Sequence, residues 1–329
     1  MTMTNRDTDT RACTLVDIPL IRRISDDVAV LDTEVEYTRD LYGPGGAILS
    51  SLLLPHRHAF TFISRVGDEQ AVGHFRLREP EGVAHIVYIA PTIRPQDDDT
   101  AWLHVFDAMA REAGRHDAQV LIGEVGEDDP LFETMRHSGF AVYARQQIWR
   151  RPPGEYVCLE PQVILAAAQE TDLGAIQGLV ARVVPKMLHP FIVPTGLQPG
   201  WVYYRGGRLM AYISVSKGRH GVYLTPFIDP QAMPQAPAIF HDLIQNIQGN
   251  GKLPLYVQVR RYHEWLHTPL HGLGFVPGPP QALMVRHIKA IVRQPKFALA
   301  KKSFRVVPNL VTMGEPPDDY DRDLTLLSS

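Results

Sequence analysis

The sequence has little cysteine, no long apolar run and no large excess of charge. Only Cys13 and Cys158 occur among 329 residues, and neither belongs to a CxxC pair. This scarcity argues against a disulfide framework and against a thiolate zinc site. The formal net charge is -3, so no basic surplus matches a nucleic-acid backbone or an anionic membrane. The longest apolar runs, such as residues 47–55, are too short to span a bilayer.

The composition is that of a globular protein, with 45% hydrophobic and 21% charged residues. A chain of this length accommodates two domains, each with its own core. The first residues, MTMTNRDTDTRAC, lack the basic and apolar segments of a signal peptide, so we expect a cytoplasmic protein. We predict a mobile tail over residues 1–12, domains over 13–152 and 162–292, a proline-rich linker over 153–161, and a C-terminal tail over 293–329.

Hydrophobic periodicity predicts the order of elements in the first domain. Residues 15–24 are interpreted as a first strand. Residues 59–66, 71–79 and 85–90 alternate as three antiparallel strands. An amphipathic helix follows Thr100, and after it come the strand 120–125, the short helix 131–138 and the strand 140–150. The second domain repeats this order, with strands expected at 201–206, 209–215, 221–230, 254–259 and 281–288, and helices at 236–249 and 263–270.

Landmarks at nearly constant offsets indicate that the two domains are copies of one unit. The segment PTIRPQ at residues 91–96 matches PQAMPQ at residues 230–235, an offset of 139. Gly139-Phe140 matches Gly274-Phe275, and Gln146 and Gln281 each follow the phenylalanine by six residues. Such agreement predicts an internal duplication.

Three strands, a helix, a strand, a helix and a final strand preceded by Gly-Phe resemble the GNAT superfamily of acyl-CoA-dependent N-acyltransferases. The resemblance covers both copies and is weaker in the second. It implies an α/β fold with two tandem GNAT-like domains, each a mixed, mostly antiparallel sheet flanked by helices. It also implies acetyl-CoA or another acyl-CoA as cofactor, held where two parallel strands of the sheet diverge.

The family's cofactor loop is an Arg/Gln-x-x-Gly-x-Gly/Ala segment, whose glycines let backbone N–H groups close on a pyrophosphate. The first copy keeps Arg94 but has Pro95, Asp97 and Asp99 near the glycine positions. Proline has no N–H to donate, and a carboxylate beside a phosphate is repelled. We interpret Asp97 to Asp99 as helix-capping residues, and we expect that the first domain has lost ordinary cofactor binding.

The second copy carries small uncharged residues in the same loop, so it is the better candidate for the cofactor site. Alanine at a loop glycine position does not repel a phosphate, although it disfavours positive φ. The residues that the resemblance places at this site are Ile228, Met233, Gln235, Ala236, Ala238 and Ile239, with Arg94 from the first copy.

The family's usual general acid is a tyrosine four residues before the glycine of Gly-Phe. The corresponding residues are Met135 and Leu270, which cannot donate a proton. Catalysis is still possible without this acid, because an enzyme can hold the thioester and the amine close together and supply a base for the amine. The substitutes considered are Asp229, Tyr262, His263 and Glu124, together with His85 and Tyr88.

Two functions therefore stay open from the sequence. One is an acyltransferase that moves an acyl group, most simply acetyl, from CoA to a small amine. The other is an inactive pseudoenzyme that binds or assembles with a protein partner.

His263-Glu-Trp-Leu-His267 matches the HExxH zinc pattern, but Pro269 ends the helix too early for a third ligand to follow. We predict no metal site.

Overall fold

The computed structural model describes residues 8–24, 27–39, 58–78, 82–154, 162–247 and 252–288. The predicted linker and C-terminal tail lie wholly or mostly outside these ranges. The first half contains two groups of elements in chain order. The N-terminal group is β1 (Thr8–Ala12), η1 (Leu15–Asp17), α1 (Ile18–Ile24), β2 (Ala29–Val30) and α2 (Thr33–Thr38). Next come β3 (Ala59–Val66), β4 (Glu69–Arg78), β5 (Val83–Ala90), α4 (Thr100–Arg115), β6 (Val120–Gly126), α5 (Pro130–His137) and β7 (Ala141–Arg151).

The second half repeats this order from β8 to β13. Its first group is β8 (Ala166–Ala167), η2 (Glu170–Asp172), α6 (Leu173–Val183), η3 (Lys186–Leu188) and α7 (His189–Ile192). The remaining elements are β9 (Gly200–Arg205), β10 (Arg208–Lys217), β11 (Val222–Ile228), η4 (Pro230–Gln235), α8 (Ala236–Ile247), β12 (Leu255–Arg260), η5 (Arg261–Leu266), α9 (His267–Gly272) and β13 (Val276–His287).

Two predictions about the N-terminal region are wrong. Residues 8–12 do not belong to a tail, because they form β1 and pair antiparallel with β3. Residues 15–24 form η1 and α1 instead of a first strand. Asp17 explains both, because its carboxylate accepts from the Thr14 amide at 2.9 Å and starts a helical turn, and it pairs with Arg11 of β1 at 2.7 Å. Residues 1–7 lie outside the described ranges.

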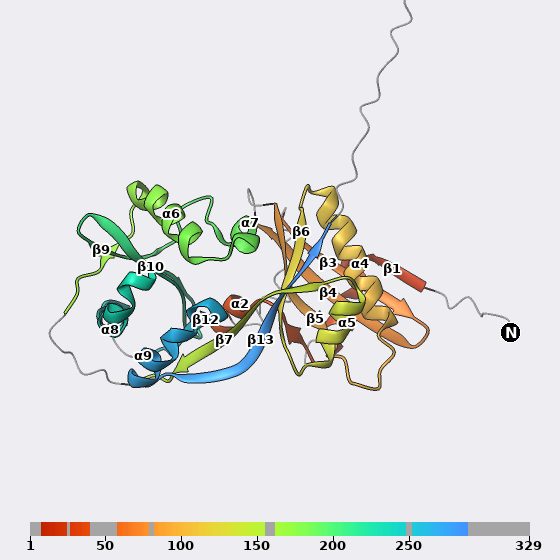
Figure 1. Ribbon diagram of the computed structural model, residues 1–329. Coiled ribbons are helices and arrows are strands. Elements are labelled where there is room, and N and C mark those ends of the chain that lie inside the picture. The colour runs from red at the N-terminus through yellow and green to blue at the C-terminus, as the bar shows by residue number, and fades with distance from the viewer. Residues whose placement is uncertain are drawn as a thin grey trace, which may run out of the picture. The chain divides into compact units, whose positions relative to one another are not determined.

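The two halves exchange their last strands within one continuous sheet (Figure 1). The strand order in the described part is β1-β3-β4-β5-β6-β13-β7-β12-β11-β10-β9-β8. Thus β13 of the second half pairs with β6 of the first, while β7 of the first half pairs with β12 of the second. At the centre of the exchange, β7 and β13 pair with each other, and Gln146 lies opposite Gln281. Because each half completes the other's sheet, both fall within one compact unit.

Each half contains one pair of parallel strands that separates after three residues. In the first half β5 pairs with β6 from Val83↔Val120 to His85↔Ile122. In the second half β11 pairs with β12 from Val222↔Leu255 to Leu224↔Val257. Beyond these residues the strands diverge, and we call the two gaps the first splay and the second splay. Their matching register confirms the internal repeat in three dimensions.

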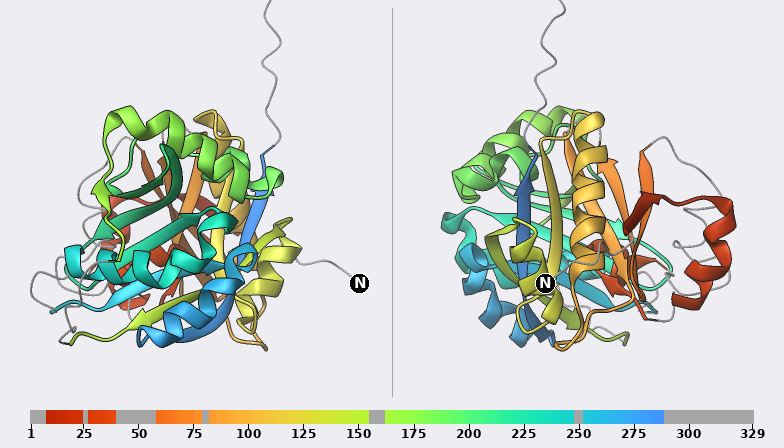
Figure 2. Two further views of the ribbon diagram at one scale, coloured as in Figure 1. Left: turned by 60° about the vertical axis from the view of Figure 1, so that its left-hand side comes forward. Right: turned by 90° about the vertical axis from the view of Figure 1, so that its right-hand side faces the viewer.

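Helices cover the two faces of the sheet unequally. On one face, α4 packs on the first half and α8 with α9 packs on the second, each over its own core. On the other face, α6 and α7 of the second half extend over residues of both halves, including Val83, Val120 and Ile122 (Figures 1 and 2). None of the helices within the described ranges is long and apolar enough to cross a bilayer.

Candidate functional site

The first splay is bridged by the protein's own backbone. Residues of β2 pair with β5, with Ala29 opposite Ile89 and Val30 opposite Tyr88. The Leu31 amide donates to the Val87 carbonyl at 2.9 Å, and the Leu31 carbonyl accepts from the Glu124 amide of β6 at 2.8 Å. One segment therefore satisfies polar backbone groups on both strands of the splay.

The side chain of Leu31 makes this bridge part of the first core. Leu31 is 2% exposed, and it packs against β6 at Gly123. A Cβ at Gly123 would lie 3.1 Å from Leu31 Cδ2, so the glycine leaves the room that the leucine occupies. The first splay is consequently filled in the folded protein by a backbone strand and by a buried side chain.

In the loop before α4, carboxylates of the loop accept hydrogen bonds from nearby backbone amide groups. Asp97 accepts from the Arg94 amide at 2.8 Å, and Asp98 accepts from the Thr100 amide at 3.0 Å. Asp99 occupies the N-cap position without a side-chain cap hydrogen bond. The capping prediction is thus confirmed for Asp98 and wrong for Asp99. The arginine side chain of residue 94 is exposed.

The second splay has no backbone bridge in the described part of the chain. Instead, the imidazole of His263, which follows β12, is buried beside the Ile228 backbone at the end of β11. Its Nε2 has no hydrogen-bond partner among the described residues. Burial lowers the pKa of His263 to about 4, and the Ile228 backbone opposes this shift. A side chain therefore lies at the outer end of this splay.

The loop that follows β11 forms the short helix η4, which is surrounded by arginines. Its N-cap residue Asp229 accepts from the Gln231 amide at 3.0 Å and pairs with Arg208 at 2.9 Å and Arg182 at 3.3 Å. Burial alone would raise the pKa of Asp229, but the amide and the two guanidinium groups lower it below its ordinary value. Arg205 donates to the Gln231 carbonyl at 3.2 Å. Two cations thus face one carboxylate at this loop, and a third contacts η4 itself.

The predicted cofactor residues of the second copy lie around η4 but differ in exposure. Met233 is 44% exposed, and Gln235 accepts from Arg205 at 3.2 Å. The Ala236 amide donates to the Met233 carbonyl within the helical segment. Ala238 is partly buried against the second core. Ile228, Ala236 and Ile239 are fully buried in that core. The cofactor role of these residues, and that of Arg94, stays a prediction.

A cavity of about 570 Å³ lies between the two halves, on the face covered by α7. We call it the central cavity. Alternation along the strands brings polar side chains to it from both halves. Its polar lining comes from Asp32, Thr33, Glu34, Arg76, Arg78, His85, Glu124, Ser214, Ser216, Lys217, Tyr223, Thr225, Gln258 and Arg260. Its apolar lining includes Leu31, Ile122, Phe191, Ile192, Tyr212, Phe227 and Leu283.

Glu124 is the carboxylate that this cavity holds most firmly. It accepts from the Thr33 amide at 3.1 Å, from the Thr33 hydroxyl, and from the Gln258 side chain at 3.3 Å. Tyr223 lies 2.9 Å from the same threonine hydroxyl. Burial, and then the charge of Glu124, raises the pKa of Tyr223 well above its ordinary value. No described cation forms an ion pair with Glu124, so its direct hydrogen-bond partners are the neutral groups of Thr33 and Gln258.

The cations of the cavity are not all paired. Arg76 pairs with Asp32 at 2.6 Å, and Arg78 pairs with Glu34 at 3.3 Å. Arg260, in contrast, forms no ion pair with a described carboxylate; its Nε is buried without a hydrogen-bond partner, and Nη1 donates to the Tyr262 hydroxyl at 3.4 Å.

His85 adds a second buried group without a partner at this wall. Its Nε2 is buried and makes no hydrogen bond to a described residue. Burial and the charges of the nearby arginines lower the pKa of His85 well below its ordinary value. The imidazole is therefore neutral at physiological pH, and it can donate or accept one hydrogen bond in the cavity.

The short helix α2 fixes one wall of the cavity by docking onto the second half. The ring of Tyr37 stacks on Tyr256 with centroids 4.3 Å apart, and Ser216 donates to Glu34 at 2.9 Å. At the β10–β11 turn, a Cβ on Gly218 would lie 1.9 Å from the Thr38 carbonyl oxygen. The close approach therefore requires glycine at this position.

Of the six catalytic candidates chosen from the sequence, the structure brings Glu124 and His85 into the central cavity. Tyr88 is buried and stacks on His74. Asp229 belongs to the η4 cluster, and Tyr262 packs against the core under α6 and α7. His263 has non-helical backbone angles inside η5, and the α-helix α9 begins only at His267. The two histidines of the HExxH match are thus not on one α-helix, which the zinc pattern requires.

The sequence reasoning missed Thr33, Tyr223, Gln258 and Arg260. A signal for the last two exists, because Gln258 and Arg260 are polar residues at alternate positions of the apolar segment LYVQVR. Alternation on a buried strand indicates that both point to one face. Arg76 and Arg78 in HFRLR carry the same signal.

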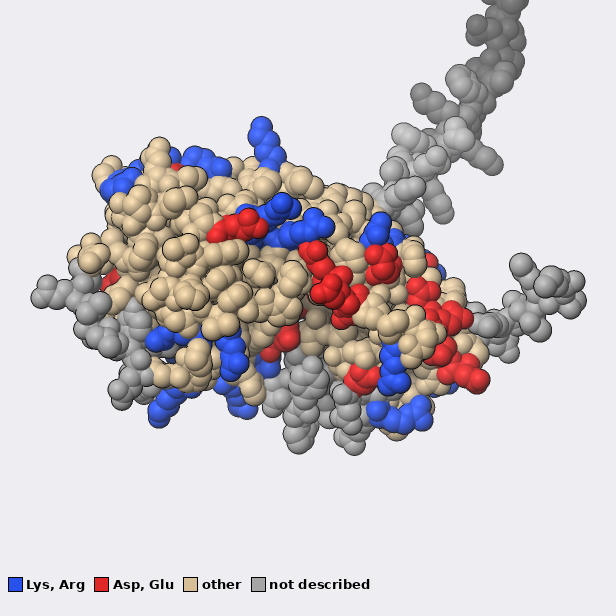
Figure 3. Space-filling model, turned by 60° about the horizontal axis from the view of Figure 1, so that its bottom comes forward, with Lys and Arg blue, Asp and Glu red and all other residues tan. Residues whose placement is uncertain are grey.

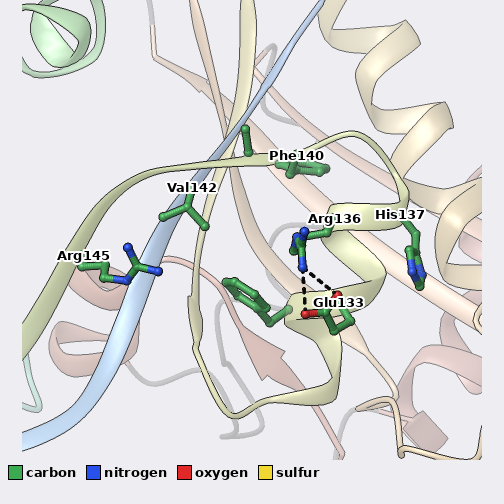
Figure 4. Close-up of a pocket in the computed structure, with 8 residues that line it drawn as sticks. Glu133, Arg136, His137, Phe140, Val142 and Arg145 are labelled. Atoms are coloured by element: carbon green, nitrogen blue, oxygen red, sulfur yellow. Dashed lines mark hydrogen bonds and ion pairs between the residues drawn. The ribbon is translucent and has the colours of Figure 1, made fainter.

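A second hollow, of about 810 Å³, lies beside α5 and β7 (Figure 4). Its charged residues are paired: Arg136 with Glu133 at 3.2 Å, and Arg145 with Glu127 at 2.8 Å. Arg136 and Glu133 are more than half exposed. The central cavity is the better candidate site, because it contains buried polar groups that the protein leaves unsatisfied.

Comparison with solved structures confirms the architecture. A GCN5-related N-acetyltransferase from Sphaerobacter thermophilus matches with a TM-score of 0.50 and 13% identity, over 87% of this chain and 97% of that chain. A tandem GNAT protein from the clavulanic acid biosynthesis pathway matches with a TM-score of 0.50 and 12% identity, over 86% and 99%. No protein-family model and no curated protein sequence matches the chain. The protein has the GNAT fold in two tandem copies.

Proposed function

We propose that the protein is an N-acyltransferase that takes an acyl group from acyl-CoA and transfers it to a small amine bound in the central cavity. The observation that carries this proposal is Glu124, a carboxylate held by Thr33 and Gln258 in a cavity between the halves. The cavity has a size typical of small-molecule sites, and both strands of the second splay contribute to its lining.

The second half is the part that fits the cofactor. The pantetheine arm would enter the second splay, where the strands diverge without a backbone bridge in the described part of the chain. Arg182, Arg205 and Arg208 at η4 would offer guanidinium groups to the phosphates, in place of the glycine amides that this loop lacks. The first half does not fit, because Leu31 fills its splay and carboxylates surround its loop.

The residues of the cavity would act on the amine. Glu124 accepts a proton from the ammonium form of the acceptor, and the free amine nitrogen attacks the thioester carbonyl carbon. The new C–N bond forms as the C–S bond breaks; the nitrogen loses a proton to become the amide, and the leaving sulfur takes up a proton to give the thiol. General-base assistance of this kind contributes about 10²–10⁴ in rate. Acyl-CoA supplies the activated thioester.

A second candidate function is an inactive scaffold that binds a protein partner. The bridged first splay favours it, because that half has replaced a ligand cleft with structure. On the face in Figure 3, Asp and Glu side chains gather over the first half, whereas the surface of the second half is mostly uncharged. An acidic surface is unsuited to CoA phosphates and leaves the first half free for a structural or docking role.

Thiol release from acetyl-CoA tests the proposal. We would incubate the full-length protein with acetyl-CoA and a panel of small amines, and follow the free thiol. We expect amine-dependent release that Glu124→Gln lowers about 10²–10⁴-fold. Glu127→Gln, which removes a carboxylate paired with Arg145 outside the cavity, should leave the rate unchanged. A native protein that neither binds acetyl-CoA nor releases thiol would contradict the acyltransferase and favour the scaffold.

A further inference from the structure

We propose that the ligand of the central cavity carries a carboxylate as well as an amine, with Arg260 holding the carboxylate and Glu124 the ammonium group. The ligand class is that of free amino acids and closely related compounds. This inference rests on the proposed function only in calling that ligand the acceptor, since its binding can be measured without the cofactor.

The charge inventory of the cavity is the first argument. Arg76 and Arg78 each have a carboxylate partner, Asp32 and Glu34. Arg260 and Glu124 have no ion-pair partner among the described residues. A guanidinium group removed from water without a counter-ion is unfavourable. Lys217 also lines the cavity without a described ion pair, but its side chain is exposed to solvent. Arg260 and Glu124 are the unpaired cation and anion that are largely withdrawn from solvent, and together they are complementary to a zwitterion.

The spacing of these two charges is the second argument. Gln258 donates to Glu124 at 3.3 Å, and Arg260 follows Gln258 by two residues on the same face of β12. Residues two apart on a strand are separated by about 7 Å. A compound whose ammonium and carboxylate are close together, each making a charge-assisted bond of about 2.8 Å, spans a similar distance. The two side-chain charges form no ion pair. Burial lowers the pKa of Arg260, but Tyr262 and the charge of Glu124 raise it, so the two charges lie near each other without meeting, as such a ligand requires.

The remaining walls indicate what else the ligand carries. Phe191 and Ile192 of α7 and Tyr212 of β10 line the cavity together with Phe227. These side chains are uncharged, and three of them are aromatic. They fit an apolar or aromatic side chain on the ligand better than a second charge. The buried Nε2 of His85 provides one more hydrogen bond at the wall with Arg76 and Arg78.

Calorimetric titration of the full-length protein with the twenty free amino acids, without acetyl-CoA, tests the inference. For each amino acid that binds, its carboxamide serves as the matched probe, because it keeps the amine and loses the negative charge. We expect at least one amino acid with an apolar or aromatic side chain to bind. Its carboxamide should bind about 10–100-fold more weakly, the range of one charge-assisted interaction.

Arg260→Gln should remove this discrimination, so that acid and amide bind the variant equally weakly. Arg260→Lys keeps the positive charge and should retain part of the preference for the amino acid over its carboxamide. Arg111→Gln, which removes an exposed arginine of α4, should bind like the native protein. A merely structural role of Arg260 would weaken acid and amide alike and preserve their ratio, which would overturn the inference.

Two further results would also overturn it: no amino acid binds, or the amides bind as tightly as the acids. A separate acetyl-CoA titration distinguishes this failure from that of the proposed function. Acetyl-CoA binding and thiol release with amines that carry no carboxylate would leave the acyltransferase standing and exclude the zwitterionic ligand.

Discussion

The two halves keep the same sheet but treat the gap between their parallel strands differently. In the first half a backbone segment ending at Leu31 hydrogen-bonds to both strands and buries its side chain in the core. In the second half the described residues form no such backbone bridge, and the buried imidazole of His263 lies beside the Ile228 backbone. A backbone bridge cannot be removed without unfolding local structure, whereas one side chain can rotate. We therefore expect a ligand to enter the second splay and not the first.

The same contrast holds for the loops that follow these strands. The first loop has carboxylates that take its amides, with Asp97 on Arg94 and Asp98 on Thr100. The second loop has arginines around a single carboxylate, Asp229. Opposite charge at equivalent loops predicts that any phosphate-bearing ligand binds to the second half.

Leu31→Ala should lower the stability of the protein more than any other substitution discussed below, because it empties a buried position in the backbone bridge. We expect the free energy of unfolding to fall by about 2–5 kcal/mol, the range for leucine truncation in a core, measured by denaturant titration. Leu197→Ala is the matched control in the second half, where the leucine is only partly buried and packs under α6 and α7. Equal losses in both variants would show that the bridge has no special structural role.

Glu36 of α2 follows Thr33, a hydrogen-bond partner of Glu124, by three residues. It should make the stability of the protein depend on pH. Burial, and then the charge of Glu124, raises the pKa of Glu36 from 4.5 to about 7. Between these values the folded protein binds more protons than the unfolded chain, so its stability decreases as pH rises from 4.5 through 7. The loss should reach about 1–3 kcal/mol.

Glu36→Gln cannot titrate and should remove this decrease. Unfolding titrations at several pH values between 4 and 8 would compare the native protein with the variant. Parallel pH profiles for the two proteins would show that Glu36 ionises normally in the folded state.

His263→Ala tests whether the second splay is closed by a side chain alone. The buried imidazole lies beside the Ile228 backbone, and we expect a ligand in that splay to displace it at a cost of about 1 kcal/mol. The variant should therefore bind acetyl-CoA about fivefold more tightly, measured by calorimetry. His137→Ala in the first half, where the histidine is 65% exposed, should have no effect. Weaker binding in His263→Ala would instead make the imidazole part of the ligand site.

Arg205→Gln should cause the smallest change among these substitutions, a modest loss of acetyl-CoA affinity. An exposed arginine beside a phosphate contributes about 0.5–1 kcal/mol, so acetyl-CoA affinity should fall about two- to fivefold at low salt. Arg94→Gln is its counterpart in the first loop and should leave the affinity unchanged. If Arg94→Gln lowers the affinity instead, the cofactor contacts the first half and the comparison fails.

The duplication and the fold could be predicted from the sequence, because they depend on periodic patterns and on landmarks such as Gly139-Phe140 and Gly274-Phe275. The absence of glycines from the first loop was also visible, since Asp97 and Asp99 stand near the glycine positions. The backbone bridge was not visible, since Ala29 to Leu31 form too short a segment to show strand alternation. Its pairing with β5 depends on tertiary contacts.

The candidate site was predicted only in part. Glu124 was among the candidates because it is a charged residue on an apolar strand. Its partners Thr33, Tyr223 and Gln258 come from α2, β11 and β12, which the exchange of β7 and β13 brings together. Sequence spacing within one domain does not show contacts that cross between two domains.

Hydrogen–deuterium exchange with and without saturating acetyl-CoA tests most directly whether the second half alone binds the cofactor. We predict slower exchange in peptides covering residues 225–231 and 258–263, and no change in peptides covering 86–91 and 123–126. Slower exchange in the first-half peptides would contradict the account, as would no change in either half.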